Sequence, residues 1–199
     1  LLLVGEKGSH HRSDREILAA SLDWALDLAR TARRPNLLDH LSGLAAYDGW
    51  ADTLETDADY PAGDEDTMRR RVMIHGDQCV MLEERHEAAS FLRRMTRVAP
   101  DAAADLESAA VCYDRAADLV GPLWPWPIDP DAGALQALAD PVTRRKLARH
   151  VRTAREREGK AVEHLERALS VLQPSKAQVD AGSRWVPNEL STQAVKYDW

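Results

Sequence analysis

Two long segments of this sequence place apolar residues at alternating spacings of four and three, and this pattern constrains the fold more than any other feature. Side chains at those spacings share one face of an α-helix, and stripes of this length are typical of helices that pack in a bundle. The first stripe, in a helix expected from about Asp66 to Val98, consists of Met68, Val72, His75, Cys79, Leu82, His86 and Ala89. The second consists of Leu147, Val151, Ala154, Glu158, Ala161, Leu165, Ala168 and Leu172. We therefore expect both segments to turn toward one dry interior.

Capping and helix-breaking residues mark the remaining helices. Ser13 and Glu16 form a capping box that begins a helix, and Pro35 marks its end. Its expected apolar face consists of Leu18, Leu22, Ala25 and Ala29, flanked by Ile17, Trp24 and Leu28. A second helix is predicted over Gly43, Tyr47, Trp50 and Leu54, before an acidic loop at 57–66. Further helices are predicted from Pro100 to the Gly121-Pro122 pair, and from the N-cap Asp140 to Gln173.

Length and composition favour a single folded unit. With 199 residues and 44% hydrophobic content, the chain can bury one sizeable core. We predict an all-α fold, an antiparallel up-and-down bundle of four to five helices over residues 13–173, followed by an extended tail at 174–199. We expect residues 1–12 to be a remnant strand or a linker. The apolar run from Leu1 to Val4 fits either the end of a buried strand in a preceding domain or an apolar tail lying on the bundle.

The charge balance excludes some classes of partner. The formal net charge is -7, whereas nucleic acids and anionic membrane surfaces are bound by basic footprints. No apolar run approaches the roughly 20 residues that cross a bilayer. The two cysteines, Cys79 and Cys112, are too few for a disulfide-stapled secreted scaffold. We therefore expect a cytoplasmic protein that binds neither nucleic acid nor membranes.

Polar residues on the apolar stripes suggest a possible metal site. His75, Cys79 and His86 share one stripe, and Glu158 interrupts the other. Glu83 and His86 also have the E-x-x-H spacing with which helical bundles build carboxylate-bridged metal sites. A second E-x-x-H pair is absent from the sequence. A bundle enzyme that binds a divalent transition metal through His75, Glu83, His86 and Glu158 is therefore one alternative, and histidines with hydrogen-bond partners in an ordinary core are the other.

Cys79 lies one helical turn from His75, the arrangement that a nucleophilic thiol with a neighbouring base requires. A thiol in the middle of a helix and on an apolar face should, however, have a raised pKa, which disfavours the reactive thiolate. The simpler interpretation is a small apolar side chain that fills the core.

Tryptophans and prolines cluster in the segment 123–130, which contains Trp124 and Trp126. Each proline fixes its own φ and restricts the residue before it, so the segment is stiff. It could form a binding surface together with Trp50 and Trp185, or it could cover the open end of the bundle. An aromatic pocket at that end would suit a small-molecule sensor.

The first half of the last helix is strongly basic. Its cationic residues are Arg144, Arg145, Lys146, Arg149, Arg152, Arg155 and Arg157. Phosphate binding is conceivable, but in an acidic chain we expect a solvated face that pairs with acidic neighbours such as the 57–66 loop.

Three short stretches carry a resemblance to a known family. They are Val4-Gly5-Glu6-Lys7, the segment 43–54 (GLAAYDGWADTL) and the segment 87–94 (EAASFLRR). Together they resemble the helical C-terminal half of bacterial papain-like proteins related to C39 peptidases and the butirosin-type acyltransferases, over about residues 1–172. In that family the catalytic cysteine and histidine belong to the papain-like half, which would precede Leu1, and neither Cys79 nor Cys112 stands in a matching motif. The resemblance implies a non-catalytic accessory domain that packs against a papain-like domain or forms a homo-oligomer.

Overall fold

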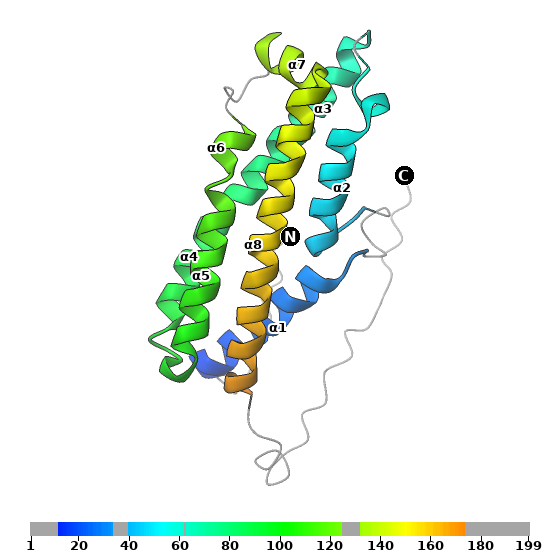
Figure 1. The fold of residues 1–199 in the computed structure, drawn as a ribbon. Helices are drawn as coiled ribbons and strands as arrows, with labels where there is room; N and C mark the ends of the chain where they lie inside the picture. Colours follow the sequence, from blue (N-terminus) through cyan, green and yellow to red (C-terminus); the bar gives the residue numbers. More distant parts are fainter. Residues whose placement is uncertain (1–11, 34–39, 62, 125–131, 174–199) are drawn as a thin grey trace, which may run out of the picture.

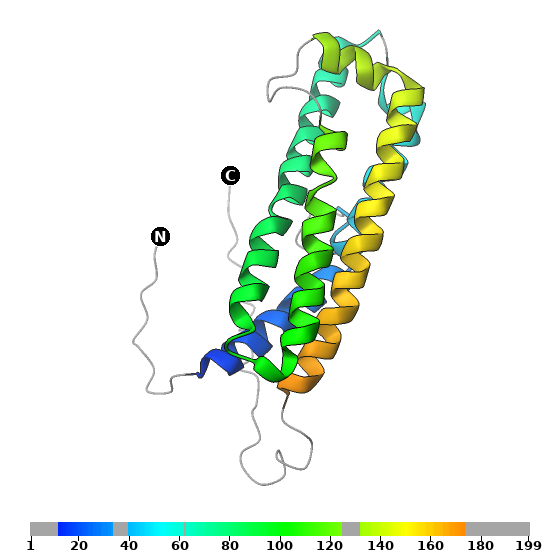
Figure 2. The same cartoon turned by 60° about the vertical axis from the view of Figure 1, so that its left-hand side comes forward.

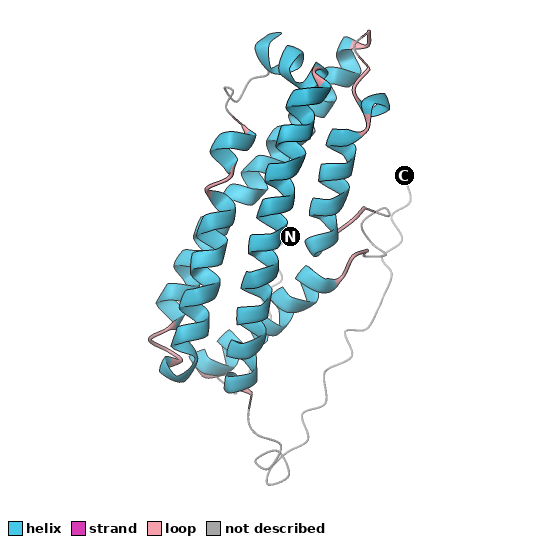
Figure 3. Cartoon of the chain, viewed as in Figure 1, coloured by secondary structure: helices cyan, strands magenta, loops and turns pink. Residues whose placement is uncertain are grey.

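The computed structural model describes residues 12–33, 40–61, 63–124 and 132–173, and these residues are almost entirely helical (Figure 3). The helices are α1 (Asp14–Arg30), α2 (Gly43–Glu55), α3 (Glu65–Glu83), α4 (Arg85–Met95), α5 (Ala103–Ala117), α6 (Val120–Leu123), α7 (Ala132–Ala139) and α8 (Pro141–Leu172). Short 3-10 turns cover Asp57–Asp59 and Pro100–Ala102. The described residues form no strand, only an isolated bridge between Arg33 and Leu41. The predicted all-α class is confirmed.

The helices form an up-and-down bundle, as predicted (Figures 1 and 2). The pair α1 and α2 runs up the molecule, α3 and α4 run down, α5 and α6 run up, and the long α8 runs down again. Helix α8 packs along α5, α2 and α1, and α4 packs along α5. The short α7, which the sequence did not predict, lies across one end of the bundle and contacts α3 and α8 (Figure 1).

The predicted N-caps form as expected. The Ser13 hydroxyl accepts from the Glu16 amide, and a Glu16 carboxylate oxygen accepts from the Ser13 amide at 2.7 Å. Asp140 accepts from the amides of Val142 and Thr143 at 3.1 and 3.0 Å. These side chains satisfy amides that the first helical turn leaves without partners, which fixes where α1 and α8 begin.

The interior consists of two apolar cores in series. One is built from α1, α4, α5 and the second half of α8, and the other from α2, α3, α6, α7 and the first half of α8. All eight residues of the predicted α8 stripe are buried. Six of the seven residues of the other predicted stripe are buried as well, and the exception is His86. The expectation that both stripes face a common interior is therefore confirmed.

The expected long third helix is interrupted at Glu84, which separates α3 from α4. The Glu84 amide bonds to Val80 and Leu82, and the Glu84 carbonyl accepts from the amide of Glu87, three residues ahead. The buried stripe nevertheless continues across this turn, from Leu82 in α3 to Ala89 in α4. Arg85, at the start of α4, donates to Glu158 of α8, whereas His86 is exposed.

Two further helices differ in detail from the sequence prediction. In α1 the buried positions are Leu18, Leu22 and Leu26, and the expected flanking residues are exposed: Ile17, Trp24 and Leu28. A spacing of four places only a narrow stripe on the core, which suits a helix that crosses the bundle at a tilt (Figure 1). Helix α5 ends at Ala117, before the predicted Gly121-Pro122 stop, and α6 runs through that pair.

Gly43 allows α2 to begin directly against the end of α1. Its φ is +56°, and a Cβ at this position would lie 2.3 Å from the carbonyl oxygen of Ala29. Only glycine fits both the left-handed backbone and the close approach. The conformation brings the start of α2 against the last turn of α1.

Candidate functional site

His75 lies in the core formed by α2, α3 and α6, and both of its ring nitrogens have partners. The Trp50 indole N–H donates to Nδ1 at 3.0 Å, and Nε2 lies 3.0 Å from the carbonyl oxygen of Leu123. Because the carbonyl can only accept, Nε2 carries the proton and the imidazole is neutral. Burial lowers the pKa of His75, which is consistent with the neutral form. The ring thus joins α2, α3 and α6.

Cys79 is buried one turn further along α3, with Sγ 4.0 Å from His75 Nε2. Burial raises the pKa of its thiol to about 12, so the nucleophilic thiolate is strongly disfavoured. His75 Nε2 also points its proton at Leu123, so it cannot act as a base toward the thiol. This geometry favours the role of a core-filling residue that the sequence suggested.

Glu158 lies between the two apolar cores and forms a polar layer with Arg85 and Tyr47. Arg85 donates from Nε to Oε2 at 2.9 Å and from Nη2 to Oε1 at 3.1 Å, and the Tyr47 hydroxyl donates to Oε2. Burial and the Glu158 charge together raise the pKa of Tyr47 and of Tyr113. Burial lowers the pKa of Arg85, but the Glu158 carboxylate outweighs this effect and the net pKa is raised. The layer is therefore an ion pair flanked by neutral phenols.

Glu83 and His86 lie on the surface and do not join Glu158 or His75. The imidazole Nδ1 of His86 is 2.9 Å from Asp114 on α5, and Glu83 is exposed. The four residues predicted as metal ligands thus occupy three separate places. Within the part of the chain that the structure describes, no group of three or more His, Cys, Asp or Glu side chains is placed to hold a metal ion. The metal site remains a sequence prediction that this geometry does not support.

Arg144 does not lie on the solvated basic face where the sequence placed it. Its side chain is 2% exposed and its guanidinium donates to backbone carbonyls at the ends of two helices: Leu54 of α2 at 3.0 Å, and Leu138 and Ala139 of α7 at 2.8 and 3.0 Å. Asp57 completes the set, as expected for a partner from the acidic loop. The guanidinium also lies over the Tyr60 ring, 4.6 Å from its centroid. Arg144 is therefore a clamp between helix ends.

Two other basic residues of α8 pair with acidic residues of α2. Arg152 bonds Glu55 at 2.7 and 2.8 Å, and Arg155 bonds Asp48 at 2.9 Å. This agrees with the expectation of a face paired with acidic neighbours, although the neighbours come mainly from α2. These pairs leave less positive charge available for a phosphate group.

Of the four tryptophans of the predicted binding surface, the structure describes Trp50 and Trp124. Trp50 is buried, because its indole packs against His75 and bonds to it, so it belongs to the core. Trp124 is half-buried and packs on α3 at Gly76, where a Cβ would lie 3.1 Å from its ring. Trp126 and Trp185 lie outside the described residues.

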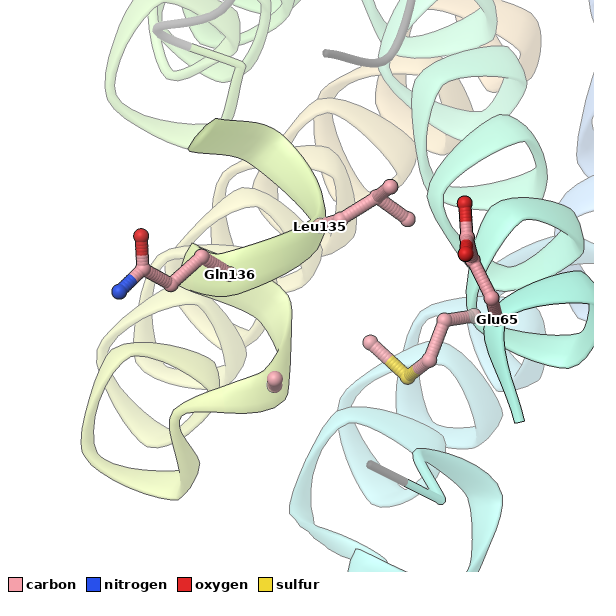
Figure 4. Close-up of a pocket in the computed structure, with 5 residues that line it drawn as sticks. Glu65, Leu135 and Gln136 are labelled. Carbon is pink, nitrogen blue, oxygen red and sulfur yellow. The ribbon is translucent and has the colours of Figure 1, made fainter. Parts of the chain in front are cut away.

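A shallow pocket lies between α3 and α7 and has a volume of about 250 Å³ (Figure 4). It is lined by Glu65, Met68, Leu135, Gln136 and Ala139. Leu135 points across toward α3, whereas Gln136 points away, and Glu65 pairs with Arg69 on its own helix. Pockets that bind small molecules are usually larger and carry several convergent polar groups. The pocket offers little support for the small-molecule sensor.

The outer face of α3 presents large apolar side chains to solvent. The outer face of α3 here means Met73, Ile74, Val80 and Met81, whose exposed fractions are 58%, 48%, 59% and 62%. They lie on the side of the helix opposite the buried stripe of Met68, Val72, His75 and Cys79. The stripe predicted from the sequence does not include this face. The sequence does indicate it, because Met73 and Val80 are seven residues apart, as are Ile74 and Met81. Residues seven apart lie on the same side of an α-helix.

The described helices also lack a span that is long and apolar enough to cross a membrane. No family model, no curated protein and no solved structure matches the chain.

Proposed function

We propose that this chain is a non-catalytic helical interaction domain that binds a partner protein through the outer face of α3. The side chains best suited to chemistry serve internal structure: His75 bonds Trp50 and Leu123, and Glu158 bonds Arg85 and Tyr47. Each of these groups has its bonding capacity used by the fold. A function on the surface is therefore favoured over one in the interior.

The outer face of α3 is the single observation that carries this proposal. Soluble proteins commonly expose single apolar residues, but several large ones grouped on one face mark interaction sites. Two of the four are methionines, whose flexible side chains adapt well to a partner surface. Figure 2 shows α3 at one side of the bundle, and the four side chains of its outer face are 48–62% exposed.

Two partners were expected from the sequence: a papain-like domain, from the family resemblance, and a second copy of the chain. An accessory role in a cytoplasmic papain-like protein is part of this proposal, and the exposed helix face is compatible with either partner. The metal-binding and sensor alternatives have no comparable observation in their favour.

The proposal is tested by site-specific photo-cross-linking. A photoreactive amino acid is placed at Val80, in the outer face of α3, or as a matched control at Glu163, an exposed position on α8. The full-length chain is irradiated inside cells that express it, and adducts are identified by mass spectrometry. We expect protein adducts from position 80 and few from position 163. Equal or absent adducts at both positions would contradict an interaction role for this face.

A further inference from the structure

We infer that the partner of the outer face of α3 is a second copy of this chain, paired antiparallel about a two-fold axis that passes at Asp77. This inference rests on the proposed function and specifies its partner. It follows from the pattern of residues along the face, which is symmetric about one position.

The apolar residues are equidistant from Asp77. Met73 and Met81 lie four residues before and after it, and Ile74 and Val80 lie three residues before and after it. A two-fold contact brings the same surface of both copies together. A residue that lies a given number of positions before the axis is then level with the partner's residue the same number of positions after it. In an antiparallel pair centred on Asp77, Met73 is level with the partner's Met81, and Ile74 with the partner's Val80.

The charges on the face follow the same symmetry with opposite sign. Arg70 and Glu84 lie seven residues before and after Asp77, which is close to two helical turns, so both remain on the same face. Both are exposed. An antiparallel pair brings each Arg70 level with the partner's Glu84, whereas a parallel pair brings like charges together. Charge complementarity therefore favours the antiparallel arrangement.

These two charges are also available for a partner. Arg70 donates to the Thr67 hydroxyl at 2.9 Å, and no ion pair joins Arg70, Asp77 or Glu84 to any other described residue. The neighbouring Arg69, in contrast, is paired with Glu65 on its own helix at 2.6 Å. An intermolecular contact would thus give Arg70 and Glu84 ion pairs that the described residues do not supply.

Asp77 itself limits the strength of this contact. At the two-fold axis it faces the partner's Asp77, and like charges brought together oppose association. A contact between single helices also falls at the small end of specific interfaces, where weak complexes are found. We therefore expect a reversible dimer whose population rises with concentration.

Sedimentation equilibrium of the full-length chain over a range of concentrations tests the inference. The wild type should show a monomer–dimer equilibrium. Met81→Glu should weaken it by at least about tenfold, because an apolar contact is lost on both sides of the axis. Asp77→Asn should tighten it by about fivefold, because the repulsion at the axis is removed. Glu163→Gln removes a negative charge outside the face and should leave the dimer constant unchanged.

A charge exchange tests the direction of pairing. Arg70→Glu and Glu84→Arg should each weaken the dimer by about tenfold, because each replaces two attractive contacts with repulsive ones. The double variant recreates opposite charges across the antiparallel contact and should recover most of the lost affinity. Neither substitution touches the core, and circular dichroism checks that each variant is folded.

The outcomes separate this inference from the proposed function. A wild-type chain that stays monomeric overturns the second copy as partner, while adducts to another protein from position 80 would still support an interaction domain. A cross-link from position 80 to residues 174–199 of the same chain overturns both. A dimer that responds neither to Asp77→Asn nor to the charge exchange overturns the antiparallel contact on α3.

Discussion

His75 shows how a polar residue can occupy a core position without acting as a ligand or a base. Its two nitrogens bond Trp50 and Leu123 only when the ring is neutral, because protonation would convert Nδ1 from an acceptor into a donor aimed at the indole N–H. The low pKa that burial imposes therefore links the fold to pH.

We expect acidification to destabilise the protein through His75. The unfolded chain takes up a proton below about pH 6.5 while the folded chain resists it, so stability rises with pH and is lost as pH falls below that value, by up to about 1.4 kcal/mol per pH unit. Urea unfolding of wild type and His75→Gln between pH 7.5 and 5 measures this. The difference in free energy of unfolding between the two should shrink as pH falls. The variant His86→Gln, which removes an exposed histidine, should lose stability on acidification as the wild type does. A constant difference would contradict the neutral role of His75.

The Arg85–Glu158 pair is a further polar group in the interior, and breaking it should cost more stability than replacing it whole. Removing one partner leaves the other charge buried, so Glu158→Leu or Arg85→Met alone should cost about 3–5 kcal/mol. The combined variant Glu158→Leu/Arg85→Met/Tyr47→Phe should recover most of that loss, because a well-packed apolar layer replaces the ion pair. Urea unfolding gives the free energies. Additive losses would mean that the three side chains do not form one unit.

At the scale of helices, Arg144 joins α2 and α7, which otherwise scarcely contact each other. It bonds carbonyls at the C-terminal ends of α2 and α7, where the helix dipole favours a cation. Arg144→Met should cost about 3 kcal/mol, since several buried carbonyls lose their donors. Arg144→Lys should restore little, because an ammonium lacks the planar fork of donors. Hydrogen exchange should show the largest loss of protection in α7; unchanged exchange there would contradict the clamp.

Helix ends could be predicted from the sequence where a local signal determines them. The Ser13–Glu16 box and the Asp140 cap involve residues two or three apart, and the structure has both. The break at Glu84 could not be predicted in this way. The apolar spacing continues across it, and Arg85 at the start of α4 pairs with Glu158, a partner 73 residues away.

The outer face of α3 was harder to predict than the core, because its exposure depends on how distant helices pack. An apolar stripe identifies one face of a helix, and the stripe predicted for α3 covers only its buried face. Met73 and Met81 belong to a second face whose exposure depends on where α2, α6 and α7 pack. Trp50, in contrast, was expected on a binding surface and is buried. Its hydrogen-bond partner His75 lies on another helix, so the sequence around Trp50 does not reveal this contact.

At the scale of the whole molecule, one long helix connects two cores. Helix α8 contributes to both, and the Glu158 layer lies on it between them. With the interior occupied by packed and paired side chains, we place the proposed partner contact on the exposed outer face of α3. The symmetry of that face about Asp77 is the basis of the proposed antiparallel dimer.

Disulfide cross-linking at the proposed axis tests this account most directly. Asp77→Cys places two thiols opposite each other in the antiparallel dimer, whereas Arg70→Cys places them about 20 Å apart, since seven residues on each side of the axis span that length. Under mild oxidation at equal concentration we expect a covalent dimer from the position-77 variant and almost none from the position-70 variant. Equal cross-linking at both positions would indicate a parallel pair, and none at position 77 would contradict the contact itself.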